Sequence, residues 1–257
     1  MEELKLLRED LAQCDEILLN TLIMRNRIVE QIMVYKEKNG LAIIQPDQEK
    51  KQAEHMTKAL EGVPHQKEIR DIFNAVYLNS KRIQARKLFD YNILLIGFMG
   101  AGKTTISNYL NLIFNMDVVE MDQIISQREG MSIPDIFEEY GEDYFRNAET
   151  ELLKELQKKR NTVISCGGGT PMRTGNHAEM KKIGKVVLLT ATPETILERL
   201  KDDHSRPLLE NNKKAELIAQ LMEKRKPSYE AVADIIIKTD GKTRLQICEE
   251  LVQKLQG

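Results

Sequence analysis

Apolar positions in the first third of the chain follow the three- and four-residue spacing of an amphipathic helix, with charged residues between them. The residues at this spacing are Leu4, Leu7, Leu11, Leu18, Leu22 and Ile32. No proline or glycine interrupts residues 2–38, so the pattern predicts one long helix that ends at Asn39-Gly40. Proline and glycine residues then delimit two further helical stretches. The pattern therefore predicts an all-α domain with helices over residues 2–38, 46–60 and 66–87.

The pattern changes at Tyr91. Asn92–Ile96 is a short apolar run followed by glycine, which is typical of a buried strand. Similar runs lie at residues 116–121, 162–165, 185–190 and 234–238, and helical segments alternate with them. Strand–helix alternation predicts an α/β domain whose five-stranded parallel sheet is covered by helices on both faces. We therefore predict an all-helical domain over residues 1–90 and an α/β domain over residues 91–257.

Composition and charge exclude several classes of partner. The net charge is −2, which gives no electrostatic basis for binding nucleic acid or an anionic membrane. No apolar run approaches the roughly 20 residues that a membrane-spanning helix needs. The three cysteines, Cys14, Cys166 and Cys248, show neither a disulfide framework nor metal-ligand spacing. We expect a cytoplasmic protein that acts on small molecules.

A glycine-rich segment follows the first predicted strand. Residues 97–104, Gly-Phe-Met-Gly-Ala-Gly-Lys-Thr, fit the P-loop pattern G-x-x-x-x-G-K-[ST], and a predicted helix comes next. The backbone N–H groups of such a loop surround phosphates, and the helix N-terminus favours their charge. Lys103 is expected to reach the β- and γ-phosphates, and Thr104 to ligate Mg²⁺. The predicted ATP-binding residues of this loop are Gly100, Ala101, Gly102, Lys103, Thr104 and Thr105.

Further polar residues stand where a second substrate could bind. Asp122 follows the second predicted strand, at the sheet edge where ligands bind in such folds, although a helix N-cap would also explain it. A carboxylate there can accept the proton of a substrate hydroxyl. The other features are Phe145-Arg146-x-x-Glu149, the triple glycine 167–169, Arg206-Pro-Leu-Leu and Arg225-x-x-x-Tyr229.

In this order, these features resemble shikimate kinase over nearly all of residues 92–257. The resemblance implies ATP-dependent phosphorylation of shikimate, with Mg²⁺. Asp122 would bind the shikimate hydroxyls and act as base, and Gly168 would contact shikimate through its backbone. Arg146 and Arg225 would bind the shikimate carboxylate. Arg206 would lie on a lid and reach the ATP phosphates.

The sequence differs from the shikimate kinase pattern at one acidic position. The family usually has Asp two residues before the substrate-binding aspartate, where it helps to organise Mg²⁺, and this chain has Glu120. The nearest candidate for a late ATP-contacting arginine of the family is Arg244. A related kinase that acts on gluconate is the alternative, but the Arg146 and Arg225 pair favours a carboxylate on a compact ring.

Two cationic residues of the first predicted helix lie too far apart to bind the same small ligand from one chain. Arg8 and Arg25 are 17 positions apart, about 25 Å along a helix and about 100° out of register. Arg25 and Lys36 are nearly in register, about 16 Å apart, so their long side chains could hold a small dianion between them. Ser80 and Gln84, four residues apart, share one face of the third helix.

The order Leu-x-x-Leu-Arg8, Arg25, Tyr-Lys36, Glu49, Ser80 and Gln84 resembles the all-helical class of chorismate mutase over residues 3–88. The resemblance implies that three helices from each of two chains intertwine, so that Arg8 enters the partner's site. It implies a site in which Arg8 and Arg25 bind carboxylates, Lys36 and Gln84 face the ether oxygen, Glu49 takes the ring hydroxyl and Ser80 assists at the ring carboxylate.

This half also departs from its family, with Gln45 where Asp is usual and Gln48 where Arg is usual. The combined prediction is a homodimeric enzyme with two steps of aromatic biosynthesis on one chain, shikimate kinase and chorismate mutase. The alternative is a shikimate kinase whose helical domain is catalytically silent and serves dimerisation or regulation.

Overall fold

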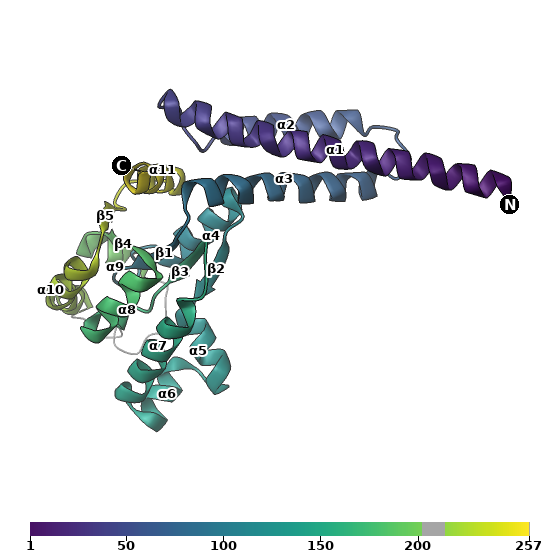
Figure 1. Cartoon of the computed structure of the whole chain (residues 1–257). Coiled ribbons are helices and arrows are strands. Elements are labelled where there is room, and N and C mark those ends of the chain that lie inside the picture. The colour runs from purple at the N-terminus through teal and green to yellow at the C-terminus, as the bar shows by residue number, and fades with distance from the viewer. Residues whose placement is uncertain (202–213, 257) are drawn as a thin grey trace. The chain divides into compact units, whose positions relative to one another are not determined.

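The computed structural model describes residues 1–201 and 214–256. Within them the chain forms two compact units, Met1–Lys87 and Leu88–Gly257 (Figure 1). Arg206, predicted to contact ATP, lies outside the described residues.

The first unit consists of three helices, as predicted. They are α1 (Glu2–Lys38), α2 (Pro46–Ala59) and α3 (Gln66–Leu88). Pro46 stands in the first turn of α2, where its missing N–H costs no helical hydrogen bond. Contacts between Arg25 and Tyr77 and between Glu49 and Lys81 join α3 to both other helices.

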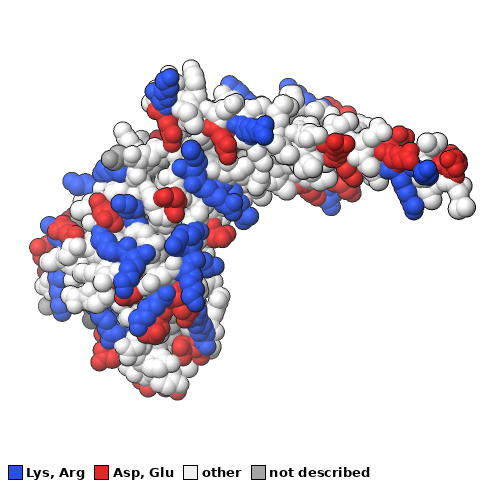
Figure 2. All heavy atoms as spheres, in the orientation of Figure 1, with Lys and Arg blue, Asp and Glu red and all other residues white. Residues whose placement is uncertain are grey.

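Many large apolar side chains of α1 are exposed. Of its 37 residues, all of them described, Val29 and Met33 are buried. Leu7 and Leu11 are 60% and 62% exposed, and Figure 2 shows uncharged side chains over much of this helix. In the described part of the chain, no helix is long and apolar enough to cross a membrane.

The second unit is built on a parallel sheet, as predicted. In the described residues its five strands have the order β2-β3-β1-β4-β5. The central strand β1 is buried at every position, because helices cover both faces of the sheet (Figure 1). The strands are β1 (Asn92–Ile96), β2 (Asp117–Glu120), β3 (Thr162–Ser165), β4 (Gly184–Thr190) and β5 (Ile235–Lys238).

Helices connect the strands and form the walls of the site. Ser132 and Asp135 cap the start of α6 with reciprocal hydrogen bonds, which stabilises the first turn of that helix. The helices are α4 (Lys103–Phe114), α5 (Met121–Glu129), α6 (Ile133–Tyr140), α7 (Glu142–Leu156), α8 (Gly175–Ile183), α9 (Pro193–Arg199), α10 (Lys214–Val232) and α11 (Arg244–Gln256), with a short 3₁₀ helix over Thr170–Met172.

A buried asparagine fixes the start of the central strand. Asn92 donates from Nδ2 to the carbonyl oxygens of Lys159 (2.9 Å) and Ile183 (3.1 Å). Its Oδ1 accepts from the backbone N–H of Thr162 at 3.1 Å. Because every polar group of this side chain has a partner, its burial stabilises the alignment of β1 with β3 and the segment before β4.

Candidate active sites

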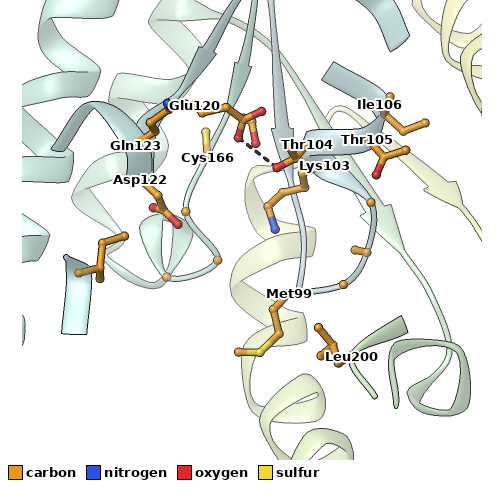
Figure 3. Close-up of a pocket in the computed structure, with 18 of the residues that line it drawn as sticks. Met99, Lys103, Thr104, Thr105, Ile106, Glu120, Asp122, Gln123, Cys166 and Leu200 are labelled. Carbon is orange, nitrogen blue, oxygen red and sulfur yellow. Dashed lines mark hydrogen bonds between the residues drawn. The ribbon is translucent and has the colours of Figure 1, made fainter. Parts of the chain in front are cut away.

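A cavity of about 1310 Å³ lies at the carboxyl ends of β1, β2 and β3. In the sheet, β2 and β3 lie on one side of β1, and β4 and β5 lie on the other. Ligands bind at such a switch in strand order. The P-loop, Asp122 and the triple glycine all line this cavity, and Figure 3 shows Lys103, Thr104, Glu120 and Asp122 around it.

The P-loop has the conformation that its glycines allow. Gly97, Gly100 and Gly102 have φ values of 142°, 76° and 101°, a region that side chains disfavour. A Cβ on Gly97 would also lie 2.3 Å from the Leu189 carbonyl oxygen of β4. Lys103 Nζ donates to the Gly97 and Phe98 carbonyl oxygens at 2.9 and 3.1 Å, so its ammonium is held over the loop.

Glu120 links β2 to the helix that follows the P-loop. Its Oε2 accepts from the Thr104 hydroxyl at 3.2 Å and its Oε1 from the buried Ser107 hydroxyl at 2.7 Å (Figure 3). The Thr104 hydroxyl and the Glu120 carboxylate are hard oxygen donors, which Mg²⁺ prefers, and they lie beside the phosphate loop. These residues fit a Mg²⁺ that is completed by nucleotide phosphates and water. No cluster of three acidic, histidine or cysteine side chains suited to a metal occurs in the described ranges.

Asp122 stands in the first turn of α5 and lines the cavity. A Cβ on Gly167 would lie 2.5 Å from the Asp122 carboxylate and 2.7 Å from that of Glu149. The bare backbone at Gly167 therefore makes room for two carboxylates at the end of β3. Glu149 is fully buried, and burial raises its pKa above the usual glutamate value, although Arg146 and the Thr170 hydroxyl partly offset the effect.

Arg146, on α7, lies between two carboxylates of its own helix. Its Nη1 donates to Glu149 and its Nη2 to Glu142, each at 2.7 Å. Its guanidinium also lies 5.6 Å from the Phe145 ring centre and 5.9 Å from that of Phe137. These contacts hold a cation at the cavity wall with part of its surface accessible.

The triple glycine admits the Arg146 side chain. A Cβ on Gly169 would lie 2.2 Å from both terminal nitrogens of Arg146. Any side chain at this position would therefore displace the guanidinium. From the sequence, the triple glycine was expected to let a ligand approach the backbone at the end of β3. The structure shows that Gly167 and Gly169 also accommodate the protein's own charged side chains.

Arg225 and Tyr229 bring α10 to the same cavity. The Arg225 guanidinium lies 5.6 Å from the Phe98 ring centre of the P-loop. The Tyr229 hydroxyl donates to the Gly168 carbonyl oxygen at 2.6 Å, which fixes the backbone predicted to contact substrate. Burial raises the Tyr229 pKa, so the phenol remains a donor at neutral pH.

Two further arginines border the phosphate loop. Arg199, at the end of α9, donates from Nη1 to the Gly100 carbonyl oxygen and to the Thr239 hydroxyl, both at 3.0 Å. Arg244, the candidate for a late ATP contact, lies 5.4 Å from the Tyr109 ring centre and lines the cavity.

Arg25 and Ser80 meet in the helical unit. Arg25 Nη1 donates to the buried Ser80 hydroxyl, which donates in turn to the Val76 carbonyl oxygen at 2.9 Å. The guanidinium lies 5.5 Å from the Tyr77 ring centre. This contact brings the central part of α1 to α3, although the two residues are 55 positions apart.

Lys36 lies near Glu49. Its Nζ donates to the Ile43 carbonyl oxygen at 3.0 Å, and Glu49 pairs with Lys81 at 2.8 Å. Burial lowers the Lys36 pKa, and the Glu49 carboxylate partly opposes this. The half-buried Gln84 follows Ser80 by one turn of α3.

Arg8 does not join this group within one chain. It is exposed on α1, an uninterrupted helix on which 17 residues correspond to about 25 Å. Of the two positions that depart from the mutase pattern, Gln45 is half-buried at the N-cap of α2 and Gln48 is exposed.

Several residues in or next to the C-terminal cavity had no role assigned from the sequence. Glu149 and Tyr229 were part of the motifs, but their contacts with Arg146 and Gly168 depend on tertiary packing. No sequence signal pointed to Ser107, Phe98 or Arg199, because each acts through a partner distant in the chain or across a helical turn. Burial raises the pKa of Cys166 well above its usual value, so this thiol stays protonated at neutral pH.

Two family models match the chain in separate segments. The shikimate kinase model matches residues 99–256 and the chorismate mutase type II model matches residues 7–85.

Curated relatives and solved structures match the C-terminal part. The shikimate kinases of Sulfurihydrogenibium sp. and Dehalococcoides mccartyi are 44% and 42% identical over 165 residues, 64% of this chain and 98% and 93% of the relatives. A structure of shikimate kinase from Acinetobacter baumannii in complex with shikimate matches 66% of this chain and 95% of its own, with 33% identity and a TM-score of 0.61. The shikimate kinase structure from Aquifex aeolicus matches 65% of this chain and 96% of its own, with 39% identity and a TM-score of 0.56.

Proposed function

Because this chain belongs to the shikimate kinase family and carries a chorismate mutase type II domain before it, we propose that one polypeptide catalyses both reactions. The first is transfer of the ATP γ-phosphoryl group to a shikimate hydroxyl. The second is rearrangement of chorismate to prephenate. The kinase reaction lies upstream of chorismate and the mutase reaction downstream, so no direct transfer of a product between the sites is implied.

One observation carries the kinase proposal: the P-loop and the Asp122 and Arg146 side chains line the same cavity. Phosphoryl transfer depends on positioning and charge neutralisation rather than on covalent chemistry. Lys103 and the loop N–H groups bind the ATP phosphates. Thr104 and Glu120 hold Mg²⁺, which neutralises charge on the phosphates when bound. Asp122 accepts the proton of the attacking hydroxyl.

The shikimate carboxylate is bound by arginines that already have partners. Glu142, which pairs with Arg146, is 68% exposed, whereas Glu149 is fully buried. An exposed ion pair contributes little and exchanges readily, so the substrate carboxylate displaces Glu142 while Glu149 keeps the guanidinium in place. Arg225 supplies the second cation, and the Gly168 backbone contacts the ring hydroxyls.

The kinase proposal is tested by measuring ATP turnover with shikimate, gluconate and related hydroxy acids. We expect turnover with shikimate, a loss of about 100-fold or more in kcat for Asp122→Asn, and a raised shikimate KM for Arg146→Lys. Asp135→Asn is a matched control, since Asp135 caps α6. Turnover of gluconate without shikimate would contradict the proposal.

Two contacts support the mutase proposal. Arg25 donates a hydrogen bond to Ser80, and Lys36 interacts electrostatically with Glu49. The reaction occurs within one molecule, so the site must hold a folded dicarboxylate and stabilise charge on the ether oxygen. Arg25 and Ser80 bind a carboxylate, Lys36 and Gln84 face the ether oxygen, and Glu49 takes the ring hydroxyl.

A dimer formed through the helical domain completes this site. The exposed leucines of α1 gain a partner surface, and Arg8, which cannot reach the site of its own chain, enters that of the partner. Twofold symmetry then places two equivalent sites on one helical dimer.

Mixing two inactive variants tests the shared site. We expect Arg8→Ala and Arg25→Ala each to abolish mutase activity, because each removes one cation from both sites. In a refolded equimolar mixture half of the dimers are mixed, and each mixed dimer has one intact site, so about a quarter of the activity returns. No recovery, in a mixture shown to contain mixed dimers, would refute the donation of Arg8.

The catalytically silent helical domain is the alternative function. The discriminating measurement is the loss of chorismate absorbance with the purified full chain that also phosphorylates shikimate. A rate equal to the uncatalysed background would favour a domain that serves dimerisation alone.

A further inference from the structure

The kinase proposal leaves one contact of its own site unused, the hydrogen bond between Ser107 and Glu120. Ser107 is fully buried on α4, one turn beyond Thr104. The two residues present hydroxyls from one face of α4 to the two oxygens of one carboxylate, at 2.7 and 3.2 Å. Glu120 stands at the end of β2, so this arrangement joins the helix after the P-loop to the neighbouring strand.

Ser107 has a second acceptor, the Thr104 carbonyl oxygen at 3.0 Å. A serine hydroxyl has one proton, so the two acceptors compete for it. Donation to a backbone carbonyl of the preceding turn is the ordinary behaviour of a serine inside a helix. The bond to Glu120 is shorter and its acceptor is charged, which makes it the stronger of the two.

The hydrogen bond from Ser107 restricts the Glu120 side chain, which matters because glutamate is longer than aspartate. Compared with aspartate, glutamate has one more rotatable bond and loses more conformational freedom when its carboxylate is fixed. A buried donor on one oxygen reduces that freedom before any ligand arrives. The other oxygen then stays on the Thr104 hydroxyl, beside the phosphate loop.

We propose that Ser107 is a positioning residue for the metal: it holds the Glu120 carboxylate in the orientation that binds the Mg²⁺ of the nucleotide complex. The inference rests on the proposed kinase function, within which Thr104 and Glu120 hold that ion. Ser107 itself touches neither nucleotide nor metal. It acts through Glu120.

The test measures metal binding separately from catalysis. Mn²⁺ is titrated into the full chain with ADP, and free Mn²⁺ is followed by electron paramagnetic resonance. We expect Ser107→Ala to raise the Mn²⁺ dissociation constant about tenfold, while ADP affinity without metal and the shikimate KM stay within about twofold. Ser126→Ala is the matched control, because Ser126 lies on α5 and its hydroxyl donates to the Met131 carbonyl oxygen at 2.6 Å.

A double-mutant cycle separates positioning from general packing. Glu120→Asp shortens the carboxylate and withdraws it from Ser107, so Ser107→Ala should weaken Mn²⁺ binding less in the Glu120→Asp background than in the wild type. Equal effects in both backgrounds would overturn the proposal. So would unchanged Mn²⁺ affinity in Ser107→Ala, or an equal loss of metal-free ADP affinity.

The test remains decisive if Ser107→Ala does not fold, and also if the proposed kinase function is wrong. If Ser107→Ala does not fold, Ser107→Cys keeps a buried side chain of similar size with a weak donor, and the same tenfold loss is expected. If the wild-type protein does not phosphorylate shikimate, the proposed function fails, but the Mn²⁺ titration with ADP still decides the role of Ser107.

Discussion

Gly169 gives a sharp prediction about the kinase site, because its bare backbone lies against the Arg146 guanidinium. A Cβ at this position would lie 2.2 Å from both terminal nitrogens, whereas ordinary contact begins near 3.4 Å. In Gly169→Ala the guanidinium must therefore move by about 1.2 Å. A shift of that size breaks at least one of its two 2.7 Å contacts with Glu142 and Glu149.

The expected cost follows from the partner that is lost. A hydrogen bond to a charged group contributes about 1.5 to 3 kcal/mol, and Glu149 is fully buried, so water does not replace Arg146. We expect Gly169→Ala to lower the free energy of unfolding by about 2 kcal/mol and to raise the shikimate KM at least tenfold, with the ATP KM unchanged. Urea unfolding and initial rates at varied shikimate concentrations measure the two effects.

Gly175→Ala is the matched control. A Cβ at Gly175, in the first turn of α8, would meet no atom within 4 Å, so stability should stay the same or rise slightly. A shikimate KM within twofold of wild type in a folded Gly169→Ala protein would refute the reasoning that Gly169 accommodates Arg146.

Three other outcomes follow from individual side chains. The raised pKa of Glu149 means that the folded state binds its proton more tightly than the unfolded state. The unfolding free energy should therefore fall as pH rises from the usual glutamate pKa through the folded one, and urea unfolding of Glu149→Gln should lack this slope. Because burial lowers the Lys36 pKa, mutase kcat/KM should fall at alkaline pH with a midpoint below 10.5, and Lys36→Ala should abolish mutase but not kinase activity. Asn92→Ala leaves three backbone groups without their partner, two of them in the buried residues Thr162 and Ile183, so thermal or urea unfolding should show a loss of about 2 kcal/mol.

The fold was largely predictable because its signals are local. Helical spacing and the absence of proline or glycine predicted α1 with the bounds that the structure shows, Glu2–Lys38. The run Asn92–Ile96, followed by Gly97, predicted β1, and the P-loop pattern placed Lys103 at the start of α4. Each prediction depends on residues within one or two turns of each other, so no knowledge of distant contacts was needed.

The arrangement of the candidate sites was less predictable, since it depends on which segments meet. Arg146 was identified from its motif, but its position between Glu142 and Glu149, against Gly169, follows from the packing of α7 beside the end of β3. The contact of Ser107 with Glu120 requires α4 to lie beside β2. The electrostatic interaction of Lys36 with Glu49 requires the start of α2 to lie near the end of α1.

The sequence by itself determined the two kinds of domain, the phosphate loop and the separation of Arg8 from Arg25, since helix periodicity and rise are fixed by backbone geometry. The tertiary structure decided which carboxylates hold Arg146, which hydroxyls hold Glu120 and which apolar residues of α1 remain exposed. These features depend on side-chain distances between segments far apart in the chain, and local sequence patterns carry no information about such distances.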